Sequence, residues 1–234
     1  MLKDTLRKIN FFIGIIFFYN QLKKKKLVSS EPEFYILKDF IKKNDGVVDI
    51  GANIGRYSFK LSSLVGDKGA VYAFEPILRN YLTFITLIFI HDAKNIIPFN
   101  MALSDETKLL KMNEVKTSIR KKVLFNTYTA SKVHKEGNLT HYSTKLDNLK
   151  IKKKISFIKI DVEGHEMEVL RGAKNSVKRD KPIILIQDND KKVINYLKSW
   201  GYEQAKIKIK HGRKNYLFIH KKKMVLFLKS IYKN

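Results

Sequence analysis

The sequence predicts an α/β fold: a mostly parallel seven-stranded sheet with helices on both faces and an antiparallel hairpin at one end. From Glu33 onward, short apolar runs alternate with amphipathic segments, which is the pattern of successive βα units. The chain has 234 residues, enough for one sizeable α/β domain and few for two. It contains no internal repeat and no Gly/Ser-rich linker, so we expect one domain with tails.

The expected strands and helices alternate along the chain. Strands are predicted over 47–50, 70–74, 95–102, 155–160 and 182–186, and helices over 33–43, 57–65, 78–90, 165–177 and 191–200. Two more strands, 205–209 and 216–220, are expected to form the closing hairpin. Residues 106–150 are less regular, with one strand candidate at 108–112.

Positive charge is concentrated at the two ends of the chain. The net charge is +25, and residues 206–234 contain no acidic residue. Such an excess suits an anionic surface, which lipid headgroups, a phosphorylated glycan carrier or nucleic acid would present. A general solubilising charge is the alternative.

An apolar run near the N-terminus suggests contact with a membrane. Residues 9–19 are strongly apolar and are flanked by Lys8 and the lysines at 23–26, but a membrane-crossing helix needs about twenty residues. No small-residue cleavage site follows, which argues against a signal peptide. We expect either an interfacial helix or a helix packed on the domain, and the C-terminal run 224–232 poses the same choice.

The domain boundaries follow from these tails. We expect a basic and apolar N-terminal segment over 1–30, the domain over 31–220 and a basic tail over 221–234. The chain has no cysteine, which excludes disulfides, Cys-type zinc sites and thiol nucleophiles. This composition fits a reducing compartment, and we expect a cytoplasmic protein with peripheral contact to an anionic membrane.

A cofactor loop is expected directly after the first strand. Asp49, Gly51, Asn53 and Gly55 lie in the run DIGANIG, whose glycine spacing differs from the G-x-G-x-x-G of dinucleotide sites. Ligands of open α/β sheets bind at the carboxyl ends of the strands. An acid at this position suits the amino group of a bound amino acid better than a pyrophosphate, because like charges repel.

A second acid, Glu75, ends the next strand in the run AFEP, where it can accept hydrogen bonds from both hydroxyls of a ribose. An amino-acid group at the first strand and a ribose at the second together describe S-adenosylmethionine (SAM). Ser104 and Asp105 follow the third strand, so we expect them beside the adenine. A nucleotide-sugar or NAD enzyme is the alternative interpretation of this edge.

Three blocks of sequence resemble those of FkbM-type methyltransferases. The blocks are VDIGANIG from Val48, YAFEP from Tyr72, and IKIDVEGHE from Ile158 with VLRGA behind it. The resemblance covers about residues 45–190 and implies a Rossmann-like class I methyltransferase fold. It also implies O-methylation of sugar or polyketide-type hydroxyls with SAM as donor. The family commonly has Glu after the fifth strand, where this chain has Gln187-Asp188-Asn189.

The third block supplies the candidate catalytic groups. Methyl transfer to a hydroxyl needs an aligned acceptor and a group that takes its proton. Asp161 ends the fourth strand, and Glu163 and His165 lie on the following turn. His165 is the natural base near neutral pH, and its alternative role is to cap the helix that follows. Glu166 and Glu168 are interpreted as first-turn acids that complement the helix dipole.

A magnesium site is a further possibility at the same edge. Asp161, Asp188 and Asn189 resemble the Asp and Asp-Asn ligands of catechol-type O-methyltransferases. Two carboxylates and an amide oxygen suit Mg2+, which would also hold the acceptor oxygen. The alternative is that Asp188 and Asn189 belong to the polar turn that opens the next helix.

Three classes of function remain in competition. The favoured one is O-methylation of a sugar, a glycan or glycolipid, or another small molecule. The positive charge also suits an RNA methyltransferase, but the chain lacks the Asn/Asp-Pro-Pro-Tyr loop of amino-group methylases and the cysteine of carbon-5 pyrimidine methylation. Nucleic acid is therefore a less favoured partner than a hydroxyl acceptor. A non-catalytic membrane-associated scaffold is the third class, and the intact Asp49, Gly51 and Glu75 argue against it.

Overall fold

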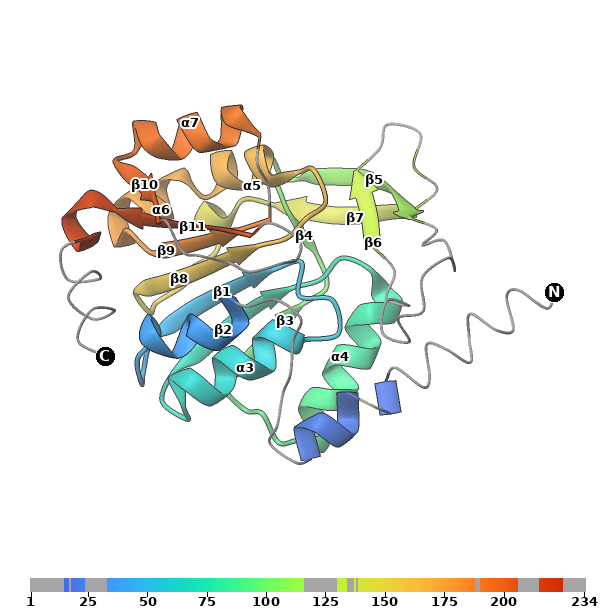
Figure 1. The fold of residues 1–234 in the computed structure, drawn as a ribbon. Helices are drawn as coiled ribbons and strands as arrows, with labels where there is room; N and C mark the ends of the chain where they lie inside the picture. The colour runs from blue at the N-terminus through green and yellow to red at the C-terminus, as the bar shows by residue number, and fades with distance from the viewer. Residues whose placement is uncertain are drawn as a thin grey trace, which may run out of the picture.

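The computed structural model describes residues 15–16, 18–23, 33–115, 130–133, 137, 139–187, 190–205 and 215–224. Within them the chain forms a seven-stranded sheet between two layers of helices and a separate four-stranded sheet (Figure 1). The large sheet has the strand order β10-β11-β9-β8-β1-β2-β3. The predicted fold, a mostly parallel sheet that ends in an antiparallel hairpin, is confirmed.

Five strands of the large sheet are parallel and lie at its centre and one edge. They are β1 (Gly46–Ile50), β2 (Ala70–Phe74), β3 (Ile96–Phe99), β8 (Ile155–Ile160) and β9 (Ile183–Ile186). The other edge is antiparallel and consists of β11 (Tyr216–His220) and β10 (Tyr202–Gln204). The five parallel strands match the predicted order of βα units.

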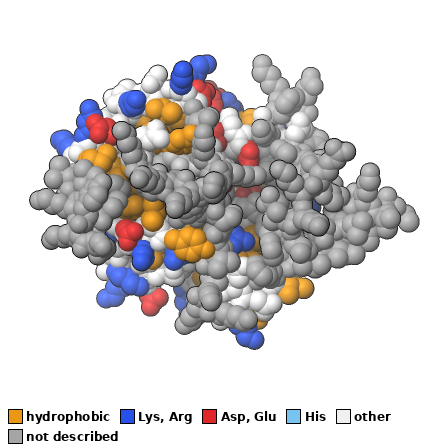
Figure 2. Space-filling view, viewed as in Figure 1, with side chains coloured by type: hydrophobic (Ala, Val, Ile, Leu, Met, Phe, Trp, Pro, Cys, Tyr) orange, Lys and Arg blue, Asp and Glu red, His pale blue; other side chains and the backbone are white. Residues whose placement is uncertain are grey.

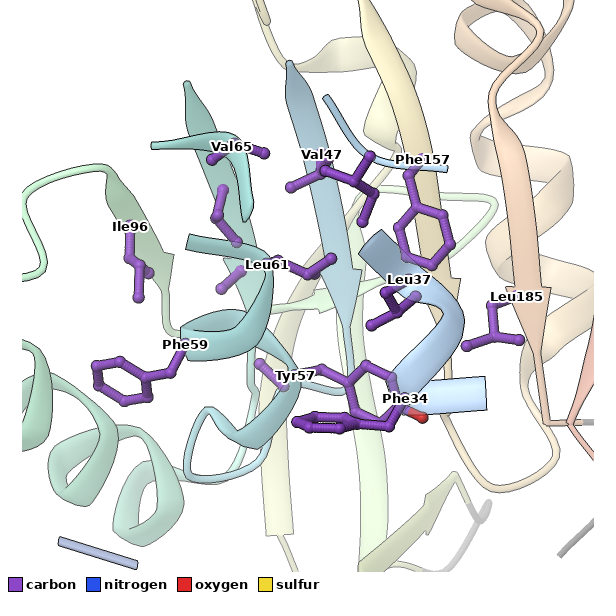
Figure 3. Close-up of a cluster of buried hydrophobic side chains, with 14 of the residues drawn as sticks. Phe34, Leu37, Val47, Tyr57, Phe59, Leu61, Val65, Ile96, Phe157 and Leu185 are labelled. Atoms are coloured by element: carbon purple, nitrogen blue, oxygen red, sulfur yellow. The ribbon is translucent and has the colours of Figure 1, made fainter. Parts of the chain in front are cut away.

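Helices cover both faces of this sheet (Figure 1). One layer contains α2 (Glu33–Ile36), η1 (Leu37–Asp39), α3 (Arg56–Val65) and α4 (Leu78–Ile90). The other contains α5 (Glu166–Gly172), α6 (Lys174–Asp180) and α7 (Lys191–Ser199). Each layer buries its own apolar cluster against the sheet, and Figure 3 shows the cluster under α2 and α3, with Phe34, Leu61 and Phe157 inside it.

Residues 106–150, for which the sequence predicted little regular structure, form most of the second sheet. Its strands are β4 (Ala102–Leu103), β5 (Lys108–Val115), β6 (Ala130–Val133) and β7 (Leu139–Thr144), in the order β4-β7-β5-β6. The predicted strand at 108–112 is the first part of β5. The small sheet lies at the end of the molecule where the parallel strands finish (Figure 1), so it borders the expected cofactor edge. The short helix η2 (Leu146–Asn148) leads from it to β8.

The third predicted strand, 95–102, is divided between the two sheets. β3 ends at Phe99, and the side-chain amide of Asn100 donates to the backbone carbonyls of Glu75 and Pro76 at 2.9 and 3.0 Å. The chain then leaves the large sheet, and β4 begins at Ala102.

Three other boundaries differ from the prediction. The helix expected over 165–177 breaks at Ala173, because the Asp147 carboxylate accepts the N–H groups of Asn175 and Ser176, both at 2.8 Å, and so starts α6 separately. The helix expected over 33–43 ends in the 3₁₀ turn η1. The first arm of the hairpin is β10, a few residues before the predicted 205–209.

The N-terminal segment is described only in part. Residues 18–23 are helical, and Phe18 is fully buried with its ring edge-on to Phe59 at 5.9 Å. This part therefore packs on the domain, while most of the predicted segment 1–30 and residues 225–234 lie outside the described residues (grey in Figure 2). No helix within the described part of the chain is long and apolar enough to cross a membrane.

Candidate cofactor and methyl-transfer site

Four parallel strands end in one row. Ile50 at the end of β1 is in register with Phe74 of β2 and with Ile160 of β8, and Ile160 aligns with the last residue of β9. The residues that follow these ends are Gly51, Glu75, Asp161 and Gln187. The structure therefore brings the three predicted sequence blocks to the same edge of the sheet.

The loop after β1 is shaped by close backbone approaches. Gly51 has φ +79°, and a Cβ there would lie 1.9 Å from the carbonyl oxygen of Asp161. Gly55 has φ +93°, and a Cβ there would lie 2.2 Å from the ring of Phe84 on α4. Asn53 also adopts a left-handed conformation, with φ 54°. The absence of a side chain at Gly51 thus lets the loop pack against the turn after β8, and its contact with the cofactor remains a prediction.

Glu75 joins the loops after β1 and β2. Its carboxylate accepts the N–H of Asn53 at 2.8 Å on one oxygen, and the N–H of Ile77 at 2.9 Å and the amide of Asn80 at 3.3 Å on the other. The side chain is almost fully buried, and burial raises its pKa to about 7 against these hydrogen bonds. Glu75 therefore fixes the Asn53 loop, and its contact with a ribose remains a prediction.

Replacing Glu75 by Gln is expected to weaken SAM binding at least about tenfold, because the amide turns a donor toward groups that already donate. In the wild type, SAM affinity should fall as the pH drops below about 7, since protonation removes the charged acceptor. Without SAM, the free energy of unfolding should fall as the pH rises toward 7. The reason is that Glu75 binds its proton more tightly in the folded state than in the unfolded chain. Calorimetric titration and thermal melts between pH 6 and 8 measure both effects. A Glu75→Gln variant with wild-type affinity and the same pH dependence would contradict the assignment.

Asp49 lies beneath the loop rather than at its surface. Its side chain is fully buried and accepts the hydroxyl hydrogen of Ser58 at 2.6 Å. Burial raises the pKa of Asp49, and Lys159 and the Ser58 hydroxyl offset part of that effect. Asp49 therefore supports the loop from below, and its contact with the cofactor's amino group remains a prediction.

Lys159 is a buried cation at the centre of the edge. Its Nζ lies 3.2 Å from Oδ2 of Asp161 and 3.8 Å from Oδ1 of Asp49. The same ammonium lies 4.6 Å from the centroid of the Tyr57 ring, which is close enough for a cation–π contact. Lys159 is 5 % exposed, whereas the side chain of Asp161 is 26 % exposed. The lysine therefore links the hidden carboxylate to the one that reaches solvent.

The turn after Asp161 is held by Glu166. One oxygen of this buried carboxylate accepts the N–H groups of Val162 and Gly164 at 3.3 and 3.1 Å. Glu163 is left-handed with φ 54°, and Gly164 has φ +102° with open space where a Cβ would stand. The Glu166 carboxylate thus fixes the backbone of the turn, while the turn is open at Gly164. Glu166 therefore does more than complement the helix dipole.

His165 is tied to the start of the second sheet. Its Nε2 lies 2.9 Å from the hydroxyl of Ser104, and its Nδ1 lies 3.5 Å from a carboxylate oxygen of Glu168. Burial lowers the pKa of His165, although Glu168 and Asp105 act in the opposite direction. The Ser104 hydroxyl also donates to Asp105 at 3.1 Å. The structure therefore joins the predicted base to the predicted adenine contacts, which the sequence had placed separately.

Of the three predicted magnesium ligands, the structure describes only Asp161. Asp188 and Asn189 lie outside the described residues, and within those residues there is no group of three His, Asp or Glu side chains that could hold a metal. One oxygen of Asp161 already faces the Lys159 ammonium. Magnesium remains a prediction, and methyl transfer that continues unchanged in excess chelator would overturn it.

A mostly parallel Rossmann-like sheet with an antiparallel end hairpin and a glycine loop after its first strand is the fold of the class I methyltransferases. The model of the methyltransferase FkbM domain matches residues 49–203. The chain therefore belongs to the FkbM methyltransferase family. No curated protein matches the sequence.

Solved structures agree with this fold. The FkbM methyltransferase from Methylobacillus flagellatus has a TM-score of 0.55 and 20% identity over 76% of this chain, which spans only 44% of that protein. SMU.1697c from Streptococcus mutans, solved with SAH, has a TM-score of 0.50 and 13% identity, with coverage of 80% of this chain and 93% of that one. At these identities the likeness concerns the fold alone.

The sequence analysis did not assign a role to Lys159, Ser58 or Asn80. Lys159 carried a signal, because a lysine inside the apolar strand ISFIKI needs a buried partner. Ser58 and Asn80 are ordinary helix residues in the sequence. Only the packing of α3 and α4 places them beside Asp49 and Glu75.

Proposed function

We propose that the chain transfers the methyl group of SAM to a hydroxyl of a sugar, a glycan or glycolipid, or a related small molecule. The observation that carries the proposal is Asp161, whose carboxylate is partly exposed at the row of strand ends and is fixed by Lys159 at 3.2 Å. A hydroxyl must lose its proton as the new bond forms, and a fixed, solvent-facing carboxylate suits that task.

Each part of the edge has its own task in this proposal. SAM, when bound, supplies a methyl group that its sulfonium already activates. Glu75 accepts hydrogen bonds from the ribose, and the Gly51 loop lies between that acid and Asp161. Asp161 orients the acceptor hydroxyl and takes its proton, while Lys159 keeps the carboxylate in place. The acceptor oxygen then gains the methyl carbon as the carbon–sulfur bond breaks.

His165 fits a positioning role better than the role of base. Both of its nitrogens face protein groups, Ser104 and Glu168, and burial lowers its pKa. It holds the start of the second sheet against α5, where a Cβ on Gly172 would lie 1.9 Å from the Ser104 carbonyl oxygen. Glu163, partly exposed on the strained turn, is placed to contact the acceptor.

The acceptor class is tested by labelled SAM offered to a cell-envelope extract and, in parallel, to total RNA. We expect label in a glycan or glycolipid fraction, in a linkage that resists mild base as an ether does. The Glu75→Gln variant serves as the control for background transfer. Label that enters RNA instead would overturn the hydroxyl acceptor in favour of nucleic acid and leave the SAM assignment intact.

A further inference from the structure

Helix α4 carries a stripe of exposed apolar side chains. Leu78, Leu82, Phe89 and Ile90 are 55, 49, 85 and 50 % exposed. These are four of the nine large apolar side chains that are exposed among the described residues. Single exposed apolar residues are ordinary, but four on one thirteen-residue helix form a patch that calls for a partner.

The stripe lies on the side of α4 that faces away from the sheet. Leu78, Leu82 and Phe89 are spaced by four and seven residues, so they share one helix face. The opposite face is used by the core, where Phe84 and Leu87 are fully buried. The inner face of α4 therefore packs in the core, and the outer face stays exposed in the described part of the folded domain.

The position of α4 explains why the described chain leaves this face open. The helix packs on β3, which is the edge strand of the large sheet (Figure 1). Near its C-terminal end the ring of Tyr19 lies 5.4 Å from that of His91. Ile16, near the N-terminus, is also exposed, at 59 %.

Exposed cations lie at the two ends of α4. Arg79 in the first turn and Lys23 on the N-terminal helical segment are exposed, and the Lys94 side chain beyond the last turn is 82 % exposed. The α4 sequence itself contains no acid, and the nearby Asp92 is paired with Lys94 at 3.1 Å.

We propose that the outward stripe of α4, formed by Leu78, Leu82 and Phe89, docks the protein on an anionic lipid bilayer. The apolar side chains enter the boundary between headgroups and acyl chains while the cations at the two ends of α4 meet the anionic headgroups. A second copy of a chain with net charge +25 would bring like charges together at the same surface. The proposal stands independently of the methyl acceptor. Because α4 begins three residues after Glu75, docking would also bring the cofactor edge close to the bilayer.

Co-sedimentation with vesicles tests this docking. The full chain should bind vesicles that contain phosphatidylglycerol more tightly than pure phosphatidylcholine vesicles, and less so as salt is raised. Leu82→Gln/Phe89→Gln should weaken binding by at least about tenfold. The matched control is Leu109→Gln/Tyr142→Gln, which changes two exposed apolar residues paired across β5 and β7. Since the lysine-rich N-terminus is the same in both variants, the difference between them reports on α4.

A fluorescence measurement gives an independent readout. In a Trp200→Phe background, Phe89→Trp should shift its emission to the blue when phosphatidylglycerol vesicles are added, and Leu109→Trp should not. Equal vesicle binding by the two double variants, or no shift at position 89, would overturn the proposal. So would a wild-type dimer, seen by light scattering, that only the Leu82→Gln/Phe89→Gln variant dissociates, because a second copy would then cover the stripe.

Discussion

The Asp161→Asn variant is expected to turn over about 10²- to 10³-fold more slowly than the wild type while it still binds SAM, because the amide keeps the shape of the side chain but cannot take a proton. The ribose and loop contacts of Glu75 do not involve Asp161, so the dissociation constant of SAM should change little. Lys159 retains Asp49 as a partner, so the variant should also fold. Turnover, KM for the acceptor and calorimetric SAM affinity measure the three expectations.

Two other acids, one on the same turn and one far from it, provide the comparison. Glu163→Gln changes a partly exposed side chain of the same turn and should cost less turnover, mainly through KM, if Glu163 contacts the acceptor without taking its proton. Asp92→Asn lies on the surface beyond α4, paired with Lys94, and should leave turnover unchanged. If Asp161→Asn keeps wild-type turnover, or if Glu163→Gln loses more, the proton acceptor has been assigned to the wrong residue.

The positions of the catalytic blocks could be predicted because they follow from local signals and one topological rule. Val47–Ile50 and Ile155–Ile160 are mostly apolar runs typical of buried strands, and the carboxyl ends of parallel strands meet at one edge. Glu75 and Asp161 can therefore be assigned to the site from the sequence alone. The observed register, Ile50 beside Phe74 and Ile160, places both at that edge.

The contacts of these residues could not be predicted, because they depend on register and packing between distant segments. Asp49 and Lys159 face each other only because β1 and β8 pair in a register that the sequence does not specify. The same holds for the hydrogen bond between Ser104 and His165, which joins the end of β4 to the start of α5 across 61 residues of sequence. The second sheet was missed for a related reason, since β4 has only two residues and owes its existence to its pairing with β7.

Lys159→Met is expected to have the largest effect on stability. The substitution leaves the fully buried Asp49 carboxylate without its cation, and breaking a buried ion pair in this way costs about 3–5 kcal/mol of unfolding free energy. For a chain of this size that corresponds to a melting temperature lower by about 10 °C. Burial already raises the pKa of Asp49, and without Lys159 the carboxyl should take up a proton still more readily. The stability deficit should therefore shrink as the pH is lowered.

The double variant Asp49→Asn/Lys159→Met separates the two roles of the lysine. With the buried charge and its partner both removed, most of the lost stability should return, because no uncompensated ion is left inside. Turnover should not return with it, because Asp161 still lacks the ammonium that holds it at 3.2 Å. Recovery of both stability and turnover would show that Lys159 supports the fold alone. If neither stability nor turnover returns, the row of strand ends depends on the contact between Lys159 and the Tyr57 ring rather than on the ion pair.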